Sequence, residues 1–254
     1  MVKYSYGSIP IILILLVGSF FAKGQTTYSI TSNWVFKQGS KKDWIKAQVP
    51  GTVHTDLLAN KLIDDPYYRT NEEKLQWIER EDWEYKTEII PDQSLMNRKN
   101  IELVFEGLDT YAVVYLNGQK IIEADNMFRV WRANVKHLLR SGKNELKIHF
   151  PSVVNSLLPV YDSLKFKLPY RDNNPKNKYI NNYVRKASYQ FGWDWGPRFV
   201  TSGIWRPVYF QGWDQVKISD LFVKQKRLTA QKAELQAQLE IFSASAGLKV
   251  VEIT

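Results

Sequence analysis

The chain of 254 residues contains no cysteine, so disulfides, thiolate zinc sites and an N-terminal lipid anchor on cysteine are excluded. It also has no Asn-x-Ser/Thr acceptor for N-glycosylation. Together these two absences are more typical of a bacterial periplasm than of a eukaryotic secretory route. The three histidines stand in unrelated segments, and neither a His-Glu-x-x-His motif nor a glycine-rich phosphate loop occurs. The sequence therefore predicts no metal site and no cofactor.

Runs of like charge are also missing. The net charge is +9, but lysine and arginine are spread along the chain and never form a run of five. This distribution favours a solvated basic surface over nucleic-acid binding. The one long apolar run, residues 9–22, is too short to span a bilayer comfortably, and the small residues Ala22 and Gly24 follow it. We expect residues 1–24 to be a signal peptide of an exported protein, periplasmic or secreted, with no membrane contact after cleavage.

Helical periodicity is scarce and is expected only over residues 51–65. Aromatic residues make up 14% of the chain, and short segments rich in β-branched and aromatic residues alternate with turn formers. Asn117-Gly118 is a strong signal for a two-residue hairpin. The segments expected as strands are residues 26–36, 43–49, 82–90, 100–107, 110–124, 144–150 and 205–213. The sequence predicts an all-β protein with a jelly-roll sandwich over residues 25–212.

The C-terminal part and one internal stretch depart from this pattern. Residues 214–228, 233–245 and 248–254 resemble three further strands, whereas a sandwich of the immunoglobulin kind needs about seven. We therefore expect residues 213–254 to be the start of an immunoglobulin-like β-domain. Residues 169–184 are crowded with Asn, Lys and Tyr, and a loop of this length in a compact domain is usually functional or disordered.

The segment FGWDWGPRF, residues 191–199, places one carboxylate between two tryptophans. If residues 191–196 are extended, Trp193 and Trp195 share one face, and Asp194 lies on the other between two glycines. The carboxylate is then accessible and can accept hydrogen bonds from two adjacent hydroxyls, while the indole rings can lie against the apolar face of a sugar. The competing interpretation is that both tryptophans are core residues and that Asp194 caps a turn or pairs with Arg198 or Arg185.

The segment RKASYQFGWDWGPRFVTSGIWRPV resembles the signature region of β-mannosidases of glycoside hydrolase family 2. The segments VPGTVHTDLL, DDPYYRTNEEKLQWIEREDWEYK and FEGLDTYAVVYLNGQKIIEADNMFR resemble the N-terminal sugar-binding domain of the same family. The resemblance covers most of the chain after residue 24. FEGLD and YLNG are common to family 2 as a whole, whereas WDWGP is specific to the mannosidases.

The resemblance implies retaining hydrolysis of terminal β-mannosyl residues of an oligosaccharide or glycoconjugate. Two glutamates of a TIM barrel would perform the reaction downstream of Thr254. It also implies that Asp194 binds hydroxyls of the −1 mannose, that Trp193 and Trp195 shape that wall, and that Arg185 orients the loop or pairs with Asp194. Plain surface charge is the alternative for Arg185 and for its neighbour Lys186.

No catalytic residue is therefore expected in this chain. Glu79, Glu81 and Glu84 are interpreted as ordinary loop and strand-face acids, and His54 as structural, because a retaining glycosidase needs carboxylates rather than imidazole. Two other functions stay open. One is another family 2 activity, on a galactoside, glucuronide or glucosaminide, and the other is a non-catalytic carbohydrate-binding module.

Overall fold

The computed structural model describes residues 25–169 and 179–247. The expected signal peptide, residues 1–24, lies outside the described residues. The same is true of the third C-terminal strand expected over residues 248–254 and of most of the polar stretch at 169–184.

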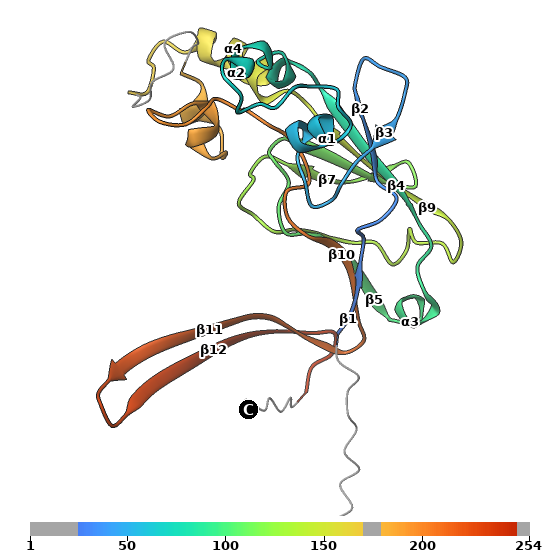
Figure 1. Ribbon diagram of the computed structural model, residues 1–254. Coiled ribbons are helices and arrows are strands. Elements are labelled where there is room, and N and C mark those ends of the chain that lie inside the picture. Colours follow the sequence, from blue (N-terminus) through green and yellow to red (C-terminus); the bar gives the residue numbers. More distant parts are fainter. Residues whose placement is uncertain (1–24, 170–178, 248–254) are drawn as a thin grey trace, which may run out of the picture.

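Two antiparallel sheets form the body of the molecule (Figure 1). The larger sheet has the order β3 (Ile45–Lys46), β2 (Val35–Gln38), β4 (Trp83–Ile89), β9 (Asn144–Phe150), β6 (Ala112–Leu116) and β7 (Gln119–Ala124). The smaller has the order β1 (Thr26–Ser29), β10 (Val208–Trp213), β5 (Asn100–Phe105) and β8 (Trp131–Asn134). The predicted all-β sandwich is confirmed.

One hydrophobic core joins the two sheets. Tyr85 and Ile148 of the larger sheet belong to the same buried cluster as Leu103 and Phe210 of the smaller one. Residues alternate between the core and the outer face along β4 and β9, as expected for strands with one buried face. The predicted hairpin is confirmed: Asn117 and Gly118 both have positive φ, as a type I′ turn between β6 and β7 requires.

Most of the short helices lie at one end of the sandwich. They are α1 (Val53–Ala59), α2 (Asn71–Lys74), α4 (Val153–Ser163), and the 3₁₀ turns η1 (Ile78–Arg80), η2 (Asn181–Tyr183) and η3 (Ser188–Phe191). The helix α3 (Gln93–Met96) lies apart from them, beside β1. The helix predicted within residues 51–65 is confirmed as α1, which begins at a capping box of Thr52 and Thr55. The sequence did not predict α4, which contains Pro159, or the edge strand β8.

A long hairpin leaves the sandwich after β10. Its strands are β11 (Val216–Leu228) and β12 (Ala233–Ser243), and Figure 1 shows it extending away from both sheets. Apolar side chains remain exposed along it, Leu221, Val223 and Leu235 among them. An isolated hairpin is at best marginally stable in water. The assignment of this part to an immunoglobulin-like domain stays a prediction. Among the described residues, no helix is long and apolar enough to cross a bilayer.

Gly203 lies where two backbone segments approach each other. It has φ +152°, and its N–H and carbonyl form hydrogen bonds with the carbonyl and N–H of Asp109 at 3.1 and 2.9 Å. A Cβ here would lie 2.6 Å from the carbonyl oxygen of Gly51. We expect Gly203→Ala to lower the free energy of unfolding by about 2 to 4 kcal/mol, measured by urea denaturation.

Gly142 offers the matched control for this substitution. No atom lies within 4 Å of a Cβ at that position. Gly142→Ala should therefore change the free energy of unfolding by no more than about 0.5 kcal/mol. Equal effects of the two substitutions would contradict the close approach of backbone at Gly203.

Candidate carbohydrate-binding site

The WDWG segment is a tight turn, so the extended conformation assumed for residues 191–196 is wrong. The 3₁₀ turn η3 ends at Phe191, and Gly192, with φ +114°, redirects the chain. The N–H of Gly196 then donates to the carbonyl of Trp193 at 3.3 Å, which leaves Asp194 and Trp195 at the tip. A positive φ at Gly192 is compatible with a turn and incompatible with a regular strand.

The two tryptophans are surface residues. Trp195 is 83% exposed and Trp193 44%, and their rings form a T-shaped pair with centroids 6.0 Å apart. The interpretation of both as core residues is therefore wrong, although Phe191 of the same segment is buried. Exposed indoles held in a fixed mutual orientation are costly in water, and such a surface usually binds something.

Asp194 is exposed at the tip of this turn and forms no hydrogen bond or ion pair with any other described residue. Arg198 pairs with Glu79 rather than with Asp194. Arg185 is exposed and joins the fold through its backbone, whose carbonyl accepts from the N–H of Met127 at 3.0 Å. The alternative pairings of Asp194 with Arg198 or Arg185 are therefore not formed, and both carboxylate oxygens remain available to a ligand.

An open groove of about 450 Å³ lies beside the turn. Trp193 and Trp195 contribute to its wall, whereas Asp194 and Arg185 do not line it. Three further aromatic residues of the groove, which the sequence analysis did not single out, are Tyr67, Tyr189 and Phe199. Flat aromatic walls of this kind suit the apolar face of a pyranose ring or an apolar side chain.

A buried ion pair supports the floor of the groove. Lys186 is 4% exposed, and its Nζ lies 2.5 Å from Oδ1 of Asp109 and donates to the carbonyl of Thr201 at 2.8 Å. Gln190 donates to the other oxygen of Asp109 at 3.2 Å. Burial lowers the pKa of Lys186, and the carboxylate of Asp109 opposes that shift. The interpretation of Lys186 as surface charge is therefore wrong.

His54 lines the groove from α1. Its Nδ1 lies 2.9 Å from Oγ1 of Thr201, and its ring packs against Phe199. Burial, with the charge of Lys186 adding to it, lowers the pKa of His54 to about 4. The imidazole is consequently neutral near pH 7, and its hydrogen bond to Thr201 fixes the groove floor.

Asp56, on the same helix, is a second buried titratable group. Its two oxygens accept hydrogen bonds from the N–H of Gln48 and from the hydroxyl of Tyr85, each at 2.8 Å. Burial raises the pKa of Asp56 to about 6, although both hydrogen bonds oppose the shift.

We expect His54 and Asp56 to give opposing pH dependences. The pKa of Asp56 is raised in the folded state, so its contribution to stability is present below pH 3.8 and is lost as the pH rises through about 6. The pKa of His54 is lowered, so its contribution is present above pH 6.5 and is lost as the pH falls through about 4. Each contribution amounts to about 2 to 3 kcal/mol.

Two substitutions separate these contributions. In Asp56→Asn only the dependence of His54 remains, so the free energy of unfolding should rise between pH 4 and 6.5. In His54→Gln only the dependence of Asp56 remains, so the free energy of unfolding should fall over the same range. Urea denaturation at several pH values measures both. Parallel profiles for the two variants would contradict the assignment.

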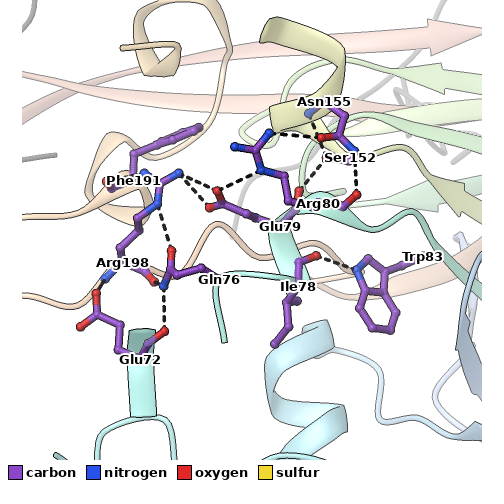
Figure 2. A network of polar contacts seen from close by, with 10 residues as sticks. All are labelled: Glu72, Gln76, Ile78, Glu79, Arg80, Trp83, Ser152, Asn155, Phe191 and Arg198. Atoms are coloured by element: carbon purple, nitrogen blue, oxygen red, sulfur yellow. Dashed lines mark hydrogen bonds and ion pairs between the residues drawn. The ribbon is translucent and has the colours of Figure 1, made fainter. Parts of the chain in front are cut away.

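A second polar network holds the other end of the turn (Figure 2). Both oxygens of Glu79 accept from Nη2 of Arg198, at 3.0 and 2.8 Å, and both side chains are buried. Glu79 is therefore not the ordinary loop acid that the sequence analysis described, whereas Glu84 is a strand-face acid paired with Lys37 and Lys147. The spacing of Glu72, Gln76 and Glu79, all of which contact Arg198, was the available sequence signal.

No group of three or more His, Asp or Glu side chains in the described parts of the chain is placed to hold a metal ion. The site consists of an exposed carboxylate, an aromatic groove and two buried ion pairs beneath them. This arrangement can bind a polyhydroxylated ligand with an apolar face.

The fold and the matched family model define the class of protein. Residues 34–206 match the glycosyl hydrolase 2 galactose-binding domain-like family, and the chain belongs to this family.

Within that class, the chain is similar to several β-mannosidases. The chain is 34% identical to the β-mannosidase of Capra hircus over 80% of this chain, and 35% identical to β-mannosidase B of Emericella nidulans over 78%. It spans 23% and 24% of these two proteins. The crystal structure of β-D-mannosidase from Dictyoglomus thermophilum is 39% identical and superposes with a TM-score of 0.78, covering 86% of this chain and 26% of that one.

A more distant likeness shows the fold alone. The β-D-glucuronidase of Dictyoglomus thermophilum is 20% identical to this chain and superposes with a TM-score of 0.57, covering 87% of this chain and 33% of that one. The predicted membership of glycoside hydrolase family 2 and the likeness to its β-mannosidases are confirmed by these comparisons.

Proposed function

We propose that this chain is the N-terminal part of an exported exo-β-mannosidase, which removes terminal non-reducing β-D-mannose residues with retention of configuration. In this proposal the turn of Trp193, Asp194 and Trp195 supplies part of the −1 sugar subsite. The substrate is a β-mannoside oligosaccharide or glycoconjugate.

The observation that supports the proposal is the unpaired carboxylate between two exposed indoles. A carboxylate accepts hydrogen bonds from two adjacent hydroxyls, and Asp194 forms no such bond with the described part of the protein. Trp193 and Trp195 offer apolar surface beside it. Arg185 lies outside the groove, and its proposed role is to orient the loop through the backbone contact with Met127.

The reaction itself requires a partner domain. The chain spans about a quarter of the β-mannosidases it resembles. We assign acid and nucleophile to two glutamates of a TIM barrel downstream of Thr254, against which the turn would be placed. By this assignment residues 1–254 alone do not hydrolyse the substrate. Residues 1–24 direct export, residues 25–212 form the sugar-binding sandwich, and residues 213–254 begin an immunoglobulin-like domain.

Sequence identity favours a mannoside substrate over those of other family 2 enzymes. This chain is 39% identical to the β-mannosidase structure and 20% identical to the β-glucuronidase structure. The test is to express the coding sequence to its natural stop and to assay chromogenic β-mannoside, β-galactoside and β-glucuronide side by side. Turnover confined to the mannoside supports the proposal. Turnover of another sugar overturns the substrate assignment, and sugar binding without any turnover would make the chain a carbohydrate-binding module.

A further inference from the structure

Arg198 closes the base of the tryptophan turn. Its Nη1 donates to the carbonyl of Phe191 at 2.7 Å, so one side chain joins the segment before the turn to the segment after it. The guanidinium also lies over the ring of Phe191, 5.6 Å from the centroid. The positions of Trp193, Asp194 and Trp195 therefore depend on where this guanidinium is held.

Three side chains from one segment hold Arg198. Glu79 binds Nη2 through both oxygens, Gln76 accepts from Nε at 3.1 Å, and Glu72 accepts from the backbone N–H of Arg198 at 2.6 Å. Gln76 also donates to the backbone carbonyl of Arg198 at 3.0 Å. Figure 2 shows these groups converging on Arg198 from residues 72–79, which comprise the end of α2 and the start of η1.

The holding segment is itself fixed to the sandwich. The hydroxyl of Ser152, the N-cap of α4, donates to the carbonyl of Glu79 at 2.6 Å. The indole N–H of Trp83, on β4, donates to the carbonyl of Ile78 at 3.1 Å. A continuous set of contacts thus runs from β4 and α4 through Glu79 and Arg198 to the turn (Figure 2).

Stability alone is a poor explanation for this ion pair. Burying two charges costs desolvation energy, and well-packed apolar residues of similar size often stabilise a protein equally well. What apolar residues cannot provide is a planar fork that binds a carboxylate on one side and a backbone carbonyl on the other. The pair therefore fits a role in fixing geometry.

We propose that Arg198, held by Glu79, is a positioning residue that sets the placement of Trp193, Asp194 and Trp195 for sugar binding. The inference rests on the proposed function, because it assigns these three residues to the sugar. Neither Arg198 nor Glu79 touches the substrate in this scheme, and both act through the turn.

The first experiment observes the turn without any sugar. The full-length protein is labelled with 5-fluorotryptophan, and Trp193→Phe and Trp195→Phe variants assign the ¹⁹F resonances of these two residues. In the double variant Glu79→Leu/Arg198→Met, which leaves no unpaired buried charge, these two resonances should move toward the shift of free 5-fluorotryptophan. The resonances of Trp131 on β8 and Trp213 on β10 should stay where they are. Glu84→Gln, which removes a carboxylate paired with Lys37 and Lys147 on a strand face, should leave the Trp193 and Trp195 resonances unchanged.

Arg198→Lys tests the same inference if the double variant does not fold. Arg198→Lys keeps the charge opposite Glu79 but cannot also reach the carbonyl of Phe191 and Gln76. It should shift the same two resonances by a smaller amount. Unchanged Trp193 and Trp195 resonances in a folded double variant, or in Arg198→Lys, would overturn the inference.

Kinetics of the full-length enzyme on a chromogenic β-mannoside distinguish a positioning role from a purely stabilising one. An ion pair that only stabilises the fold would not change kcat/KM of the folded enzyme. The double variant should lose about 10- to 100-fold in kcat/KM, as expected for a misplaced binding group. The loss of the triple variant, which adds Asp194→Ala to the double variant, should be smaller than the product of the two separate losses, because the double variant already misplaces Asp194. Losses that multiply would overturn the positioning role.

The failure of each proposal is distinguishable. If Asp194→Ala keeps wild-type kcat/KM, the proposed function of the turn fails, and the fluorine spectra alone decide the positioning inference. If Asp194→Ala is impaired and the double variant is as active as the wild type, the function stands and the inference fails.

Discussion

Asp194→Ala should lower kcat/KM of the full-length enzyme on a β-mannoside by about 10²- to 10³-fold and leave the fold unchanged. The magnitude is that expected when one hydrogen-bonding group that acts on the transition state is removed. The fold should persist because Asp194 is exposed and its side chain forms no hydrogen bond or ion pair with the described part of the protein. Steady-state kinetics and thermal unfolding measured on the same sample check both statements.

The loss should fall mainly on kcat. In retaining glycosidases, hydrogen bonds to sugar hydroxyls strengthen in the oxocarbenium-like transition state, so their removal affects the barrier more than substrate binding. Asp194→Asn keeps one acceptor oxygen and should lie between the wild type and Asp194→Ala.

Asp43 supplies the matched control, because it is an exposed carboxylate in an irregular segment outside the groove. Asp43→Ala should leave kcat and KM unchanged. Activity of Asp194→Ala within twofold of the wild type would show that the exposed carboxylate has no role in hydrolysis, and the proposed subsite would have to be abandoned.

Local signals in the sequence predicted the scaffold well. Segments rich in β-branched and aromatic residues between turn formers identified β4, β5 and β9, and Asn117-Gly118 identified the turn between β6 and β7. These features depend on near neighbours in the chain, and a pleated strand or a two-residue turn has few competing conformations. The strand β8 escaped prediction because its four residues at the sheet edge alternate only between exposed and half-buried.

The candidate site was predicted less completely, because its geometry depends on distant partners. Asp194, Trp193 and Trp195 were singled out as neighbours in one segment, but the assumed extended conformation was wrong because Gly192 adopts a positive φ. The partner of Arg198 lies 119 positions away in the chain. The spacing of residues 191–198 could therefore not show whether Arg198 forms its ion pair with the nearby Asp194 or, as observed, with the distant Glu79.

Lys186 and Asp109 show the same limitation, since they are 77 positions apart. Lys186 is fully enclosed, its ammonium contacting Asp109 and the carbonyl of Thr201. Asp109 is 1% exposed and receives further hydrogen bonds from Gln190 and from the hydroxyl of Thr110. The pair joins the segment after β5 to the floor of the groove.

Lys186→Met should lower the free energy of unfolding by about 3 to 5 kcal/mol, because it leaves the carboxylate of Asp109 buried without its counter-ion. For a chain of this size that loss corresponds to a fall in Tm of roughly 10 °C. Methionine matches the length of the lysine stem, so little packing is lost and the electrostatic effect dominates. Urea denaturation and differential scanning calorimetry measure the two quantities.

A surface pair provides the comparison. Lys143 pairs with Glu88 at 2.8 Å, with side chains 71% and 62% exposed, so Lys143→Met should change stability little. Asp109→Asn in the Lys186→Met background should recover part of the loss, because the uncompensated charge is gone while Gln190 and Thr110 keep a partner. Equal effects of Lys186→Met and Lys143→Met, or no recovery in the double variant, would mean that the buried pair does not hold the groove floor.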